Sequence, residues 1–426
     1  MLTQEDHALL AATGPKTPMG AYLRHYWLPA LLSRELPERD GAPVRVRLLG
    51  EDLIAFRNTA GAVALMREFC SHRGASLYFG RYADCAVRCW YHGWKYELDG
   101  TCTDMPNEPA ASTFKDKITQ QAYPCVERNG VIWTYMGPRA SRPPLPDLEW
   151  LTVPEDHTYT SKRIQRCHWT QGMEGDLDSS HLGFLHQEAI GRTVEHATHE
   201  SARWMLDDSN PKIELVDTDG GMLIGSRRQA DGKSYYWRIN QWFAPWYTTI
   251  PAFTGDGPLA GHAWIPTDDE TTWVFAFSYH PTRALTEGEL AHMRGGSAIH
   301  SELIPGTFAP VHNKSNGYAA GAPDAKQPWM RIKNFQDQDV AITESMGALY
   351  DRTQEHLGTT DNAIIQSRRR IINGAKALMK GEAPRANAQD FSLRPISVKL
   401  DRDVVKWSEA VAVPMEARPE TFMASV

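Results

Sequence analysis

Residues 70–109 read CSHRGASLYFGRYADCAVRCWYHGWKYELDGTCTDMPNEP, and this stretch decides the fold of the first part of the chain. It holds two short motifs, Cys70-Ser-His72 and Cys89-Trp-Tyr-His92, which 16 residues separate. Each motif offers one thiolate and one imidazole. Thiolates suit zinc or iron–sulfur chemistry, whereas imidazole suits several metals. The stretch therefore predicts a metal site that two loops build together.

The ligand types indicate which metal site this is. A Rieske [2Fe–2S] cluster has two cysteines on one iron and two histidines on the other, which raises its reduction potential. Two loops that each supply one Cys and one His meet this requirement, so we interpret Cys70, His72, Cys89 and His92 as cluster ligands. A zinc site is the alternative. The usual ligand spacing of such a zinc site, a close pair of cysteines followed by a close pair of histidines, is absent here.

Composition excludes several classes of protein. The chain has 426 residues and a formal net charge of −7, with no long basic run, which argues against a nucleic-acid partner. It has no apolar stretch long enough to span a membrane. The N-terminus, MLTQEDHALL, lacks the pattern of a secretion signal, so we expect a cytoplasmic protein.

Patterning along the chain predicts an α+β protein of two domains. Residues 43–136 read as short strands separated by turns, with Asp99-Gly100 as one hairpin turn, and a proline-rich linker follows. Strand patterns return at 233–243 and 271–279, and helical patterns follow at 339–356 and 361–380. We expect an N-terminal segment (1–42) that packs on the catalytic domain, a small all-β domain (43–140), and a catalytic domain (141–426) with an antiparallel sheet flanked by helices.

A second cluster of ionisable residues follows the linker. Asp178, His181 and His186 lie close together in the sequence, and Glu174 stands four residues before Asp178 without a clear role. A five-residue step turns about 140° off one face of an α-helix, so one regular helix would not direct both rings at one metal. A break or widened turn near Gly183 would do so. Two ordinary histidines are the alternative.

The motifs resemble a known family. Residues 70–109 closely resemble the Rieske domain of ring-hydroxylating and O-demethylating oxygenases, and look most like the phthalate dioxygenase branch. The opening TGPKTPMGAYLRHYWLPA (13–30) and the tail ESMGALYDRTQEHLGTTDNAIIQSRRR (344–370) resemble that branch too. The likeness covers nearly the whole chain. It implies the terminal oxygenase component of a multicomponent enzyme.

The resemblance also implies a mononuclear Fe(II) site. The Asp178–His181–His186 spacing is similar to the family's iron motif, in which two histidines and a remote carboxylate bind the metal. The family places that carboxylate at the start of a late helix, with Glu five residues later. Asp339 and Glu344 match this pattern, and Asp337 is the second candidate, although any helix N-terminus attracts carboxylates.

The family likeness assigns Asp178 a different role. Its carboxylate can accept a hydrogen bond from His181, three residues later. In the family, subunits form head-to-tail trimers, so His92 of one chain would reach Asp178 of the next, in a homotrimer or a dimer of trimers. Helix capping is the alternative. The chain has no Gly-x-Gly-x-x-Gly fingerprint, which supports a separate NADH- or NADPH-dependent reductase, with or without a ferredoxin.

Candidate substrate residues lie on one predicted strand. Arg238, Asn240 and Trp242 share a strand face in an aromatic stretch. An arginine among aromatic residues suits bidentate capture of a carboxylate, although an internal salt bridge is equally compatible with the sequence. We expect a small, carboxylated aromatic substrate that is hydroxylated or O-demethylated in aromatic catabolism. A Rieske electron-transfer protein without oxygenase chemistry and a hydrolase with a structural zinc are the rival functions.

Overall fold

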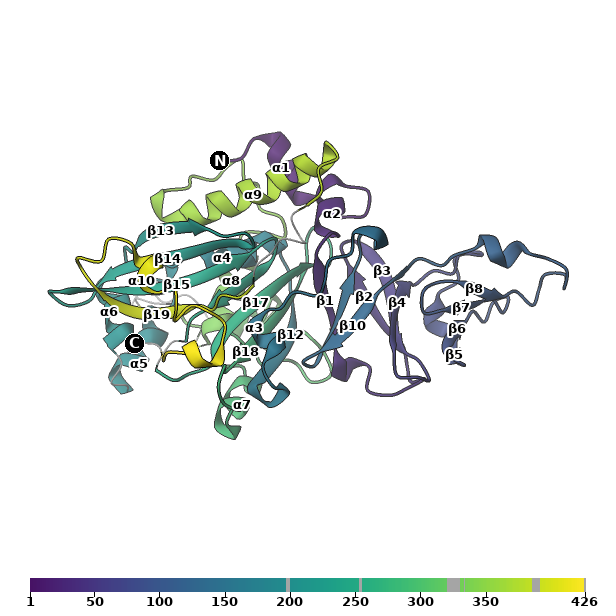
Figure 1. Ribbon diagram of the computed structural model, residues 1–426, viewed down its shortest axis with the longest axis horizontal. Coiled ribbons are helices and arrows are strands. Elements are labelled where there is room, and N and C mark those ends of the chain that lie inside the picture. The colour runs from purple at the N-terminus through teal and green to yellow at the C-terminus, as the bar shows by residue number, and fades with distance from the viewer. Residues whose placement is uncertain (197–199, 253–254, 320–329, 333, 385–390, 425–426) are drawn as a thin grey trace. The chain divides into compact units, whose positions relative to one another are not determined.

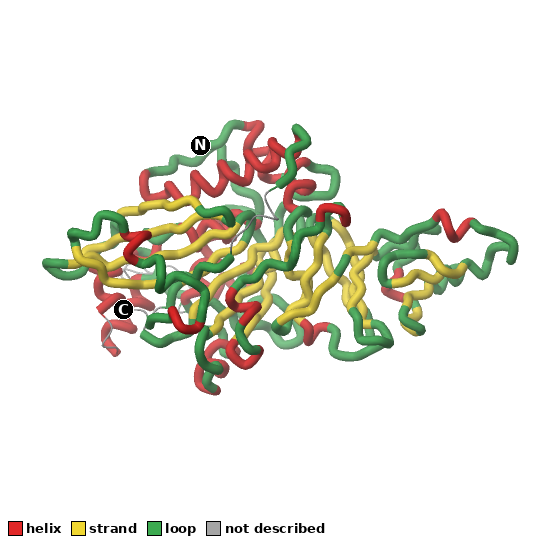
Figure 2. The backbone as a smooth tube through the Cα atoms, viewed as in Figure 1, coloured by secondary structure: helices red, strands yellow, loops and turns green. Residues whose placement is uncertain are grey.

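The computed structural model describes residues 1–426 except 197–199, 253–254, 320–329, 333, 385–390 and 425–426. The chain divides into two compact units. Thr13–Pro144 form the smaller unit, and Met1–Ala12 together with Leu145–Val426 form the larger one. Strands dominate the smaller unit, whereas the larger unit combines a wide sheet with helices (Figures 1 and 2).

This division corrects the expectation that residues 1–42 pack as one segment on the catalytic domain. Helix α1 (Gln4–Ala11) does belong to the larger unit, where it lies beside α9 (Asn362–Met379) (Figure 1). Lys376 of α9 donates a hydrogen bond to Asp6 of α1. Strand β1 (Trp27–Leu32), in contrast, is fully buried and pairs antiparallel with β11 (Val131–Tyr135) of the smaller unit. Strand β1 belongs to the smaller unit because its pairing partner there, β11, lies about 100 residues later in the sequence.

The smaller unit consists of three antiparallel sheets, with strand orders β1-β11-β10, β2-β3-β4-β9 and β5-β6-β7-β8. Its remaining elements are α2 (Pro18–Leu23), β2 (Val44–Leu48), β3 (Glu51–Arg57), β4 (Val63–Arg67), β5 (Arg81–Ala83), β6 (Ala86–Arg88), β7 (Lys95–Glu97), β8 (Cys102–Asp104), β9 (Ala122–Tyr123) and β10 (Cys125–Arg128). The predicted turn at Asp99-Gly100 does connect β7 to β8. Gly100 has a φ of +90°, and a Cβ there would lie 1.9 Å from the Gln120 carbonyl oxygen, so this turn requires glycine.

The larger unit is built on one eight-stranded antiparallel sheet of order β12-β18-β17-β16-β15-β14-β13, with β19 paired to β15. Its strands are β12 (Thr158–Gln165), β13 (Lys212–Asp217), β14 (Gly221–Gln229), β15 (Ser234–Phe243), β16 (Tyr247–Ile250), β17 (Leu259–Pro266), β18 (Thr272–Tyr279) and β19 (Ile396–Asp401). The predicted α+β class, with a small all-β domain and an antiparallel catalytic sheet, is therefore confirmed.

Helices accompany this sheet. They are α3 (Glu149–Thr152), α4 (Trp169–Leu177), α5 (Gln187–His196), α6 (Glu200–Asp207), α7 (Glu287–Arg294), α8 (Phe335–Ser345), α9 (Asn362–Met379) and α10 (Trp407–Ala410). Helix α9 matches the predicted 361–380 pattern. The predicted helix from Asp339 to about His356 is displaced: α8 begins at Phe335, because the Asn334 side chain caps it, and ends before Gly347, which has a φ of +95°. No described helix is long and apolar enough to cross a membrane.

Candidate metal centres and substrate cavity

The two Cys/His loops of the smaller unit adopt the same turn. The Cys70 N–H donates to the Ala75 carbonyl and the Gly74 N–H donates to the Cys70 carbonyl. In the second loop, Cys89 bonds in the same two ways to Trp94 and Gly93, and all four distances are 2.9 Å. Gly74 and Gly93 have φ angles of +74° and +77°, a conformation that favours glycine. The two loops therefore present their side chains in matching ways.

The four predicted cluster ligands come together with thiols beside thiols and rings beside rings. Cys70 and Cys89 are 3% and 4% exposed, and burial together with the neighbouring Cys70 thiol raises the pKa of Cys89. The His72 and His92 rings lie 4.5 Å apart and are more exposed. Among the described residues, Nδ1 of His92 is buried without a hydrogen-bond partner. This segregation fits a cluster with two thiolates on one iron and two imidazoles on the other.

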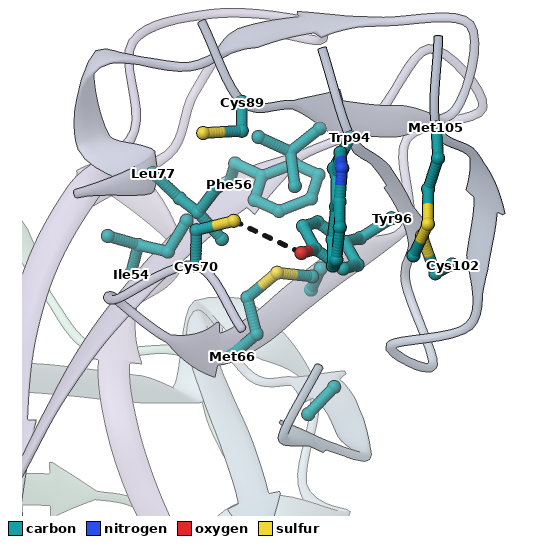
Figure 3. Packing of buried hydrophobic residues seen from close by; sticks show 13 residues of the cluster. Ile54, Phe56, Met66, Cys70, Leu77, Cys89, Trp94, Tyr96, Cys102 and Met105 are labelled. Atoms are coloured by element: carbon teal, nitrogen blue, oxygen red, sulfur yellow. Dashed lines mark hydrogen bonds between the residues drawn. The ribbon is translucent and has the colours of Figure 1, made fainter. Parts of the chain in front are cut away.

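Tyr96 supplies a hydrogen bond to this site. Its phenol oxygen lies 3.1 Å from the Sγ atom of Cys70, inside a cluster of buried side chains that also includes Trp94 and Met66 (Figure 3). Tyr96 is completely buried, so water does not compete for this bond. The phenol is the donor when Cys70 is a thiolate. Hydrogen bonds to cluster sulfurs are among the factors that set reduction potentials.

The second predicted site gathers His181, His186 and Asp339 in the larger unit. One ligand atom from each residue lies within 4.8 Å of the others. His181 opens a short 3-10 turn (His181–Gly183), and His186 comes just before α5. The predicted break near Gly183 is therefore present, and it allows both rings to approach Asp339. The Nε2 atoms of His186 and His181 lie 3.1 and 3.7 Å from Asp339 Oδ1.

The environment of His186 fits a bound cation. Its Nδ1 lies 2.7 Å from the Gln338 Oε1 acceptor, so Nδ1 carries a proton, and in a neutral ring Nε2 then holds the lone pair. Nε2 has no hydrogen-bond partner among the described residues, yet it faces the Asp339 carboxylate. Two electron-rich atoms repel unless a positive charge lies between them. Two imidazoles and one carboxylate are the donor set of non-haem Fe(II) sites with open positions.

Asp337, the second candidate, lies outside this group. Its carboxylate is buried, which raises its pKa, and its Oδ2 lies 2.8 Å from Nδ1 of His312. Asp337 and Asp339 stand two positions apart on α8, about 200° of helical rotation, and therefore point in different directions. The structure brings Asp339, and not Asp337, to the two histidines.

Asp178 and Glu174 lie on or next to α4 but have different partners. Asp178 Oδ1 accepts from the Ser180 N–H and hydroxyl at 2.7 and 2.6 Å, while Oδ2 lies 3.7 Å from His181 Nδ1. Glu174 forms a bidentate ion pair with buried Arg368 of α9 at 2.6 and 2.7 Å. Glu174 therefore ties α4 to α9, a structural role that the sequence did not reveal.

A cavity of about 520 Å³ adjoins the three-residue group. Arg238 and Asn240 line it together with His181, His186 and Asp339. Trp242, the third predicted substrate residue, is not among the described residues that line the cavity. Its side chain is 0% exposed, and its indole N–H donates to the Pro245 carbonyl in the turn between β15 and β16.

Sequence reasoning missed two further residues of the cavity wall, Asp176 and His262. Asp176 Oδ2 accepts from His262 Nδ1 at 2.8 Å, from the Trp264 indole at 2.9 Å and from the Thr248 hydroxyl. This leaves Nε2 as the His262 nitrogen available to the cavity that the residue lines. The available signal was the alternation of Ala260, His262 and Trp264, which places all three on one strand face.

Comparison with known proteins identifies the family. Residues 26–117 match the Rieske [2Fe-2S] domain, and residues 134–406 match the family described as LigXa C-terminal domain like. The chain is 33% identical to the 3-chlorobenzoate-3,4-dioxygenase oxygenase subunit of Comamonas testosteroni, over 88% of this chain and 89% of the relative. It is also 33% identical to the phthalate 4,5-dioxygenase oxygenase subunit of Pseudomonas putida, over 90% and 88%. The chain belongs to the Rieske oxygenases.

A solved structure shares the fold of this chain. NdmA from Pseudomonas putida CBB5, in its QL mutant with theobromine, superposes with a TM-score of 0.61 at 19% identity. The match covers 89% of this chain and 98% of that one. At this level of identity the likeness concerns the fold alone.

Family membership decides between the rival functions. This Rieske oxygenase is an oxidoreductase of the phthalate dioxygenase-like branch, an oxygenase subunit that works with separate electron-transfer partners. Its cofactors are a Rieske [2Fe–2S] cluster and a mononuclear iron. A structural zinc in the Cys/His loops is therefore excluded. An electron-transfer protein without oxygenase chemistry is excluded by the match of the larger unit.

Proposed function

We propose that this Rieske oxygenase oxidises a small aromatic carboxylate with electrons from a separate NADH- or NADPH-dependent reductase. The observation that carries the proposal is the position of Arg238. Its side chain is 2% exposed, and it lines the same cavity as His181, His186 and Asp339. A guanidinium at a cavity wall is the group best suited to bind a carboxylate by two parallel hydrogen bonds.

The rest of the cavity supports an aromatic ligand. Leu182, Ile250, Trp264, Met293 and Phe335 supply apolar walls, which exclude water and pack against a flat ring. Asn240 donates its amide N–H to the Asp176 carbonyl at 3.1 Å, so its Oδ1 is left as a polar group of the wall. Two relatives with 33% identity have names that specify 3-chlorobenzoate and phthalate, both aromatic carboxylates.

His262 is the second polar anchor that we propose. Asp176 holds its Nδ1–H, which fixes the ring orientation and presents Nε2 to the cavity. Burial lowers the pKa of the Arg163 guanidinium to about 10, and the nearby Asp337 and Asp176 carboxylates partly oppose this shift. In the ring tautomer that carries its proton on Nδ1, Nε2 of His262 can accept a hydrogen bond from a substrate hydroxyl. Arg238 and His262 together would orient a ring that carries two polar substituents.

We assign the metal ligands on the geometry of the two sites. Cys70, His72, Cys89 and His92 would hold the Rieske cluster, and His181, His186 and Asp339 would hold Fe(II). When bound, the iron supplies a centre with open positions at which O2 is activated. Around it, Gln338 orients His186, and Arg238 holds the substrate in the same cavity.

Asp178 is the proposed connection between the two kinds of centre. It lines the cavity beside His181 and is 21% exposed, so another chain can reach it. We infer a head-to-tail homotrimer, alone or as a dimer of trimers, in which His92 of one chain contacts Asp178 of the next. Support comes from the resemblance to the family and from the partial exposure of His92.

A substrate screen tests the proposed function. The purified oxygenase, with a surrogate reductase and NADH, is incubated with benzoates that carry chloro, hydroxy, methoxy or second carboxyl groups, and products are identified by mass spectrometry under ¹⁸O2. We expect turnover of at least one aromatic acid, and none of its matched amide or methyl ester. Oxidation of uncharged aromatics in preference to every acid would overturn the carboxylate assignment. The same screen distinguishes hydroxylation from O-demethylation.

A further inference from the structure

Helix α8 surrounds the His186 ring with three residues from its first turns. Phe335 stacks on the ring face with centroids 3.7 Å apart and an interplanar angle of 24°. Gln338 contacts Nδ1, and Asp339 Oδ1 lies 3.1 Å from Nε2. One helix therefore supplies a candidate metal ligand and also controls the position of another.

The orientation of the Gln338 amide follows from its other partner. Gln338 Nε2 lies 2.6 Å from the Ile332 carbonyl oxygen, which can only accept a hydrogen bond. The amide N–H2 therefore points to Ile332, and Oε1 must point to His186 Nδ1, at 2.7 Å. Because Oε1 is an acceptor, Nδ1 must be the protonated nitrogen. Gln338 is completely buried, so water cannot replace it.

We propose that Gln338 is a positioning residue that locks His186 in the tautomer and ring orientation that binds the mononuclear metal. The proposal rests on the proposed role of His181, His186 and Asp339 as metal ligands. Without Gln338, either ring nitrogen of His186 can carry the proton, and the ring can rotate about its Cβ–Cγ bond. Both changes would remove the Nε2 lone pair from the metal position.

The two histidines are held by partners of different charge. The Asp178 carboxylate lies beside Nδ1 of His181, whereas a neutral amide holds Nδ1 of His186. A carboxylate makes an imidazole a stronger donor but adds a negative charge to the site. The amide fixes the orientation without that charge. Asp339 then supplies the one negative charge among the three proposed metal ligands. Asp178 supplies a second negative charge beside His181.

The test measures metal affinity, which does not depend on turnover. Full-length protein is stripped of its mononuclear metal and titrated anaerobically with Co(II), and the d–d absorption gives both the Kd and the coordination geometry. We expect Gln338→Leu to weaken binding by roughly 10- to 100-fold, the range for loss of a group that orients a metal-bound histidine. Gln338→Glu keeps an acceptor at Nδ1 but loses the N–H that donates to Ile332, so the protein should still bind Co(II), with a shifted spectrum.

Gln171→Leu is the matched control. Gln171 is a buried amide of α4 that bonds to the Thr343 and Gly347 carbonyls and contacts none of the three ligand residues. Its replacement removes the same kind of group without touching His186, so the Kd should not change. Rieske absorption and thermal melting report whether each variant is folded.

The outcomes separate the inference from the proposed function. A folded Gln338→Leu protein with the wild-type Kd and spectrum overturns the role of Gln338. If Gln338→Leu does not fold, Gln338→Glu decides: retained affinity with an altered spectrum supports the role, and an unchanged spectrum or lost binding overturns it. His186→Ala is measured in parallel. If that variant also binds Co(II) normally, the proposed metal site itself is wrong.

Discussion

The phenol oxygen of Tyr96 lies 3.1 Å from the sulfur of Cys70, and both side chains are buried in the core of the smaller unit (Figure 3). A phenol that donates to a cluster sulfur stabilises the reduced cluster, which carries the more negative charge. The hydrogen bond therefore links the packing of an ordinary core residue to the energy of the electron that the cluster delivers.

Tyr96→Phe is expected to lower the midpoint potential of the Rieske cluster. Loss of a hydrogen bond with a net value of about 1 kcal/mol corresponds to roughly 40 mV for a one-electron couple. The measurement is a redox titration followed by visible absorption. Tyr82→Phe serves as the control, because the Tyr82 hydroxyl bonds to the Leu77 carbonyl instead of a ligand sulfur. Equal potentials in Tyr96→Phe and wild type would contradict the prediction.

Replacement of a cluster ligand should remove the cluster and leave the larger unit folded. Cys70→Ser and His92→Ala each delete one of four donors, and the catalytic unit has its own core. We expect loss of the visible Rieske spectrum together with retained Co(II) binding at the second site. Cys85→Ser is the control, since Cys85 is a thiol outside the two motifs. A wild-type spectrum in either ligand variant would show that the assignment is mistaken.

Asp339→Ala should lose mononuclear iron and turnover while the Rieske spectrum remains. Only two of three donors would be left at the site. Asp337→Ala should retain iron, because that carboxylate contacts His312 instead. Iron per chain, measured by elemental analysis after correction for the cluster, compares the two variants. The opposite ranking would move the ligand to Asp337.

Arg238→Gln should weaken the binding of a carboxylated substrate much more than it lowers kcat. Loss of a charge-assisted hydrogen bond costs about 1.5–3 kcal/mol, which is roughly a 10- to 150-fold increase in KM or Kd. Arg227→Gln is a suitable control, because Arg227 on neighbouring β14 contacts Tyr235 and Glu214 outside the cavity. An unchanged KM for the true substrate would return Arg238 to a structural role.

Asp178→Asn tests the proposed connection between subunits. The substitution keeps the shape of the side chain and its hydrogen bonds to Ser180 but removes the charge beside His181. We expect normal iron content, a normal Rieske spectrum and an intact trimer, yet much slower reoxidation of the reduced cluster with substrate and O2. Stopped-flow single-turnover absorption measures this rate. Near-normal reoxidation, or full activity from a verified monomer, would refute the bridge.

The sequence predicted most of the residues that the structure brings together in the two candidate metal sites, but it placed some domain and helix boundaries incorrectly. Pairs such as Cys70 and His72, or His181 and His186, are recognisable because ligands of one cofactor often share one short loop. The predicted end of the N-terminal segment at residue 42 was wrong, because β1 pairs with β11, which lies far along the chain. Strand alternation grouped Trp242 with Arg238 and Asn240, but Trp242 is not among the described residues that line the cavity.

What the amino-acid sequence determined by itself is the cofactor chemistry, since ligand identity and local spacing are properties of short segments. Tertiary structure alone decided which distant groups serve that chemistry. Gln338 meets His186 across 152 positions, and His262 meets Asp176 across 86. Neither pair leaves a periodic or spacing signal, because each contact exists only after α4, α8 and β17 have packed together. Local sequence patterns identify the candidate metal ligands, whereas tertiary packing determines which side chains form hydrogen bonds with them.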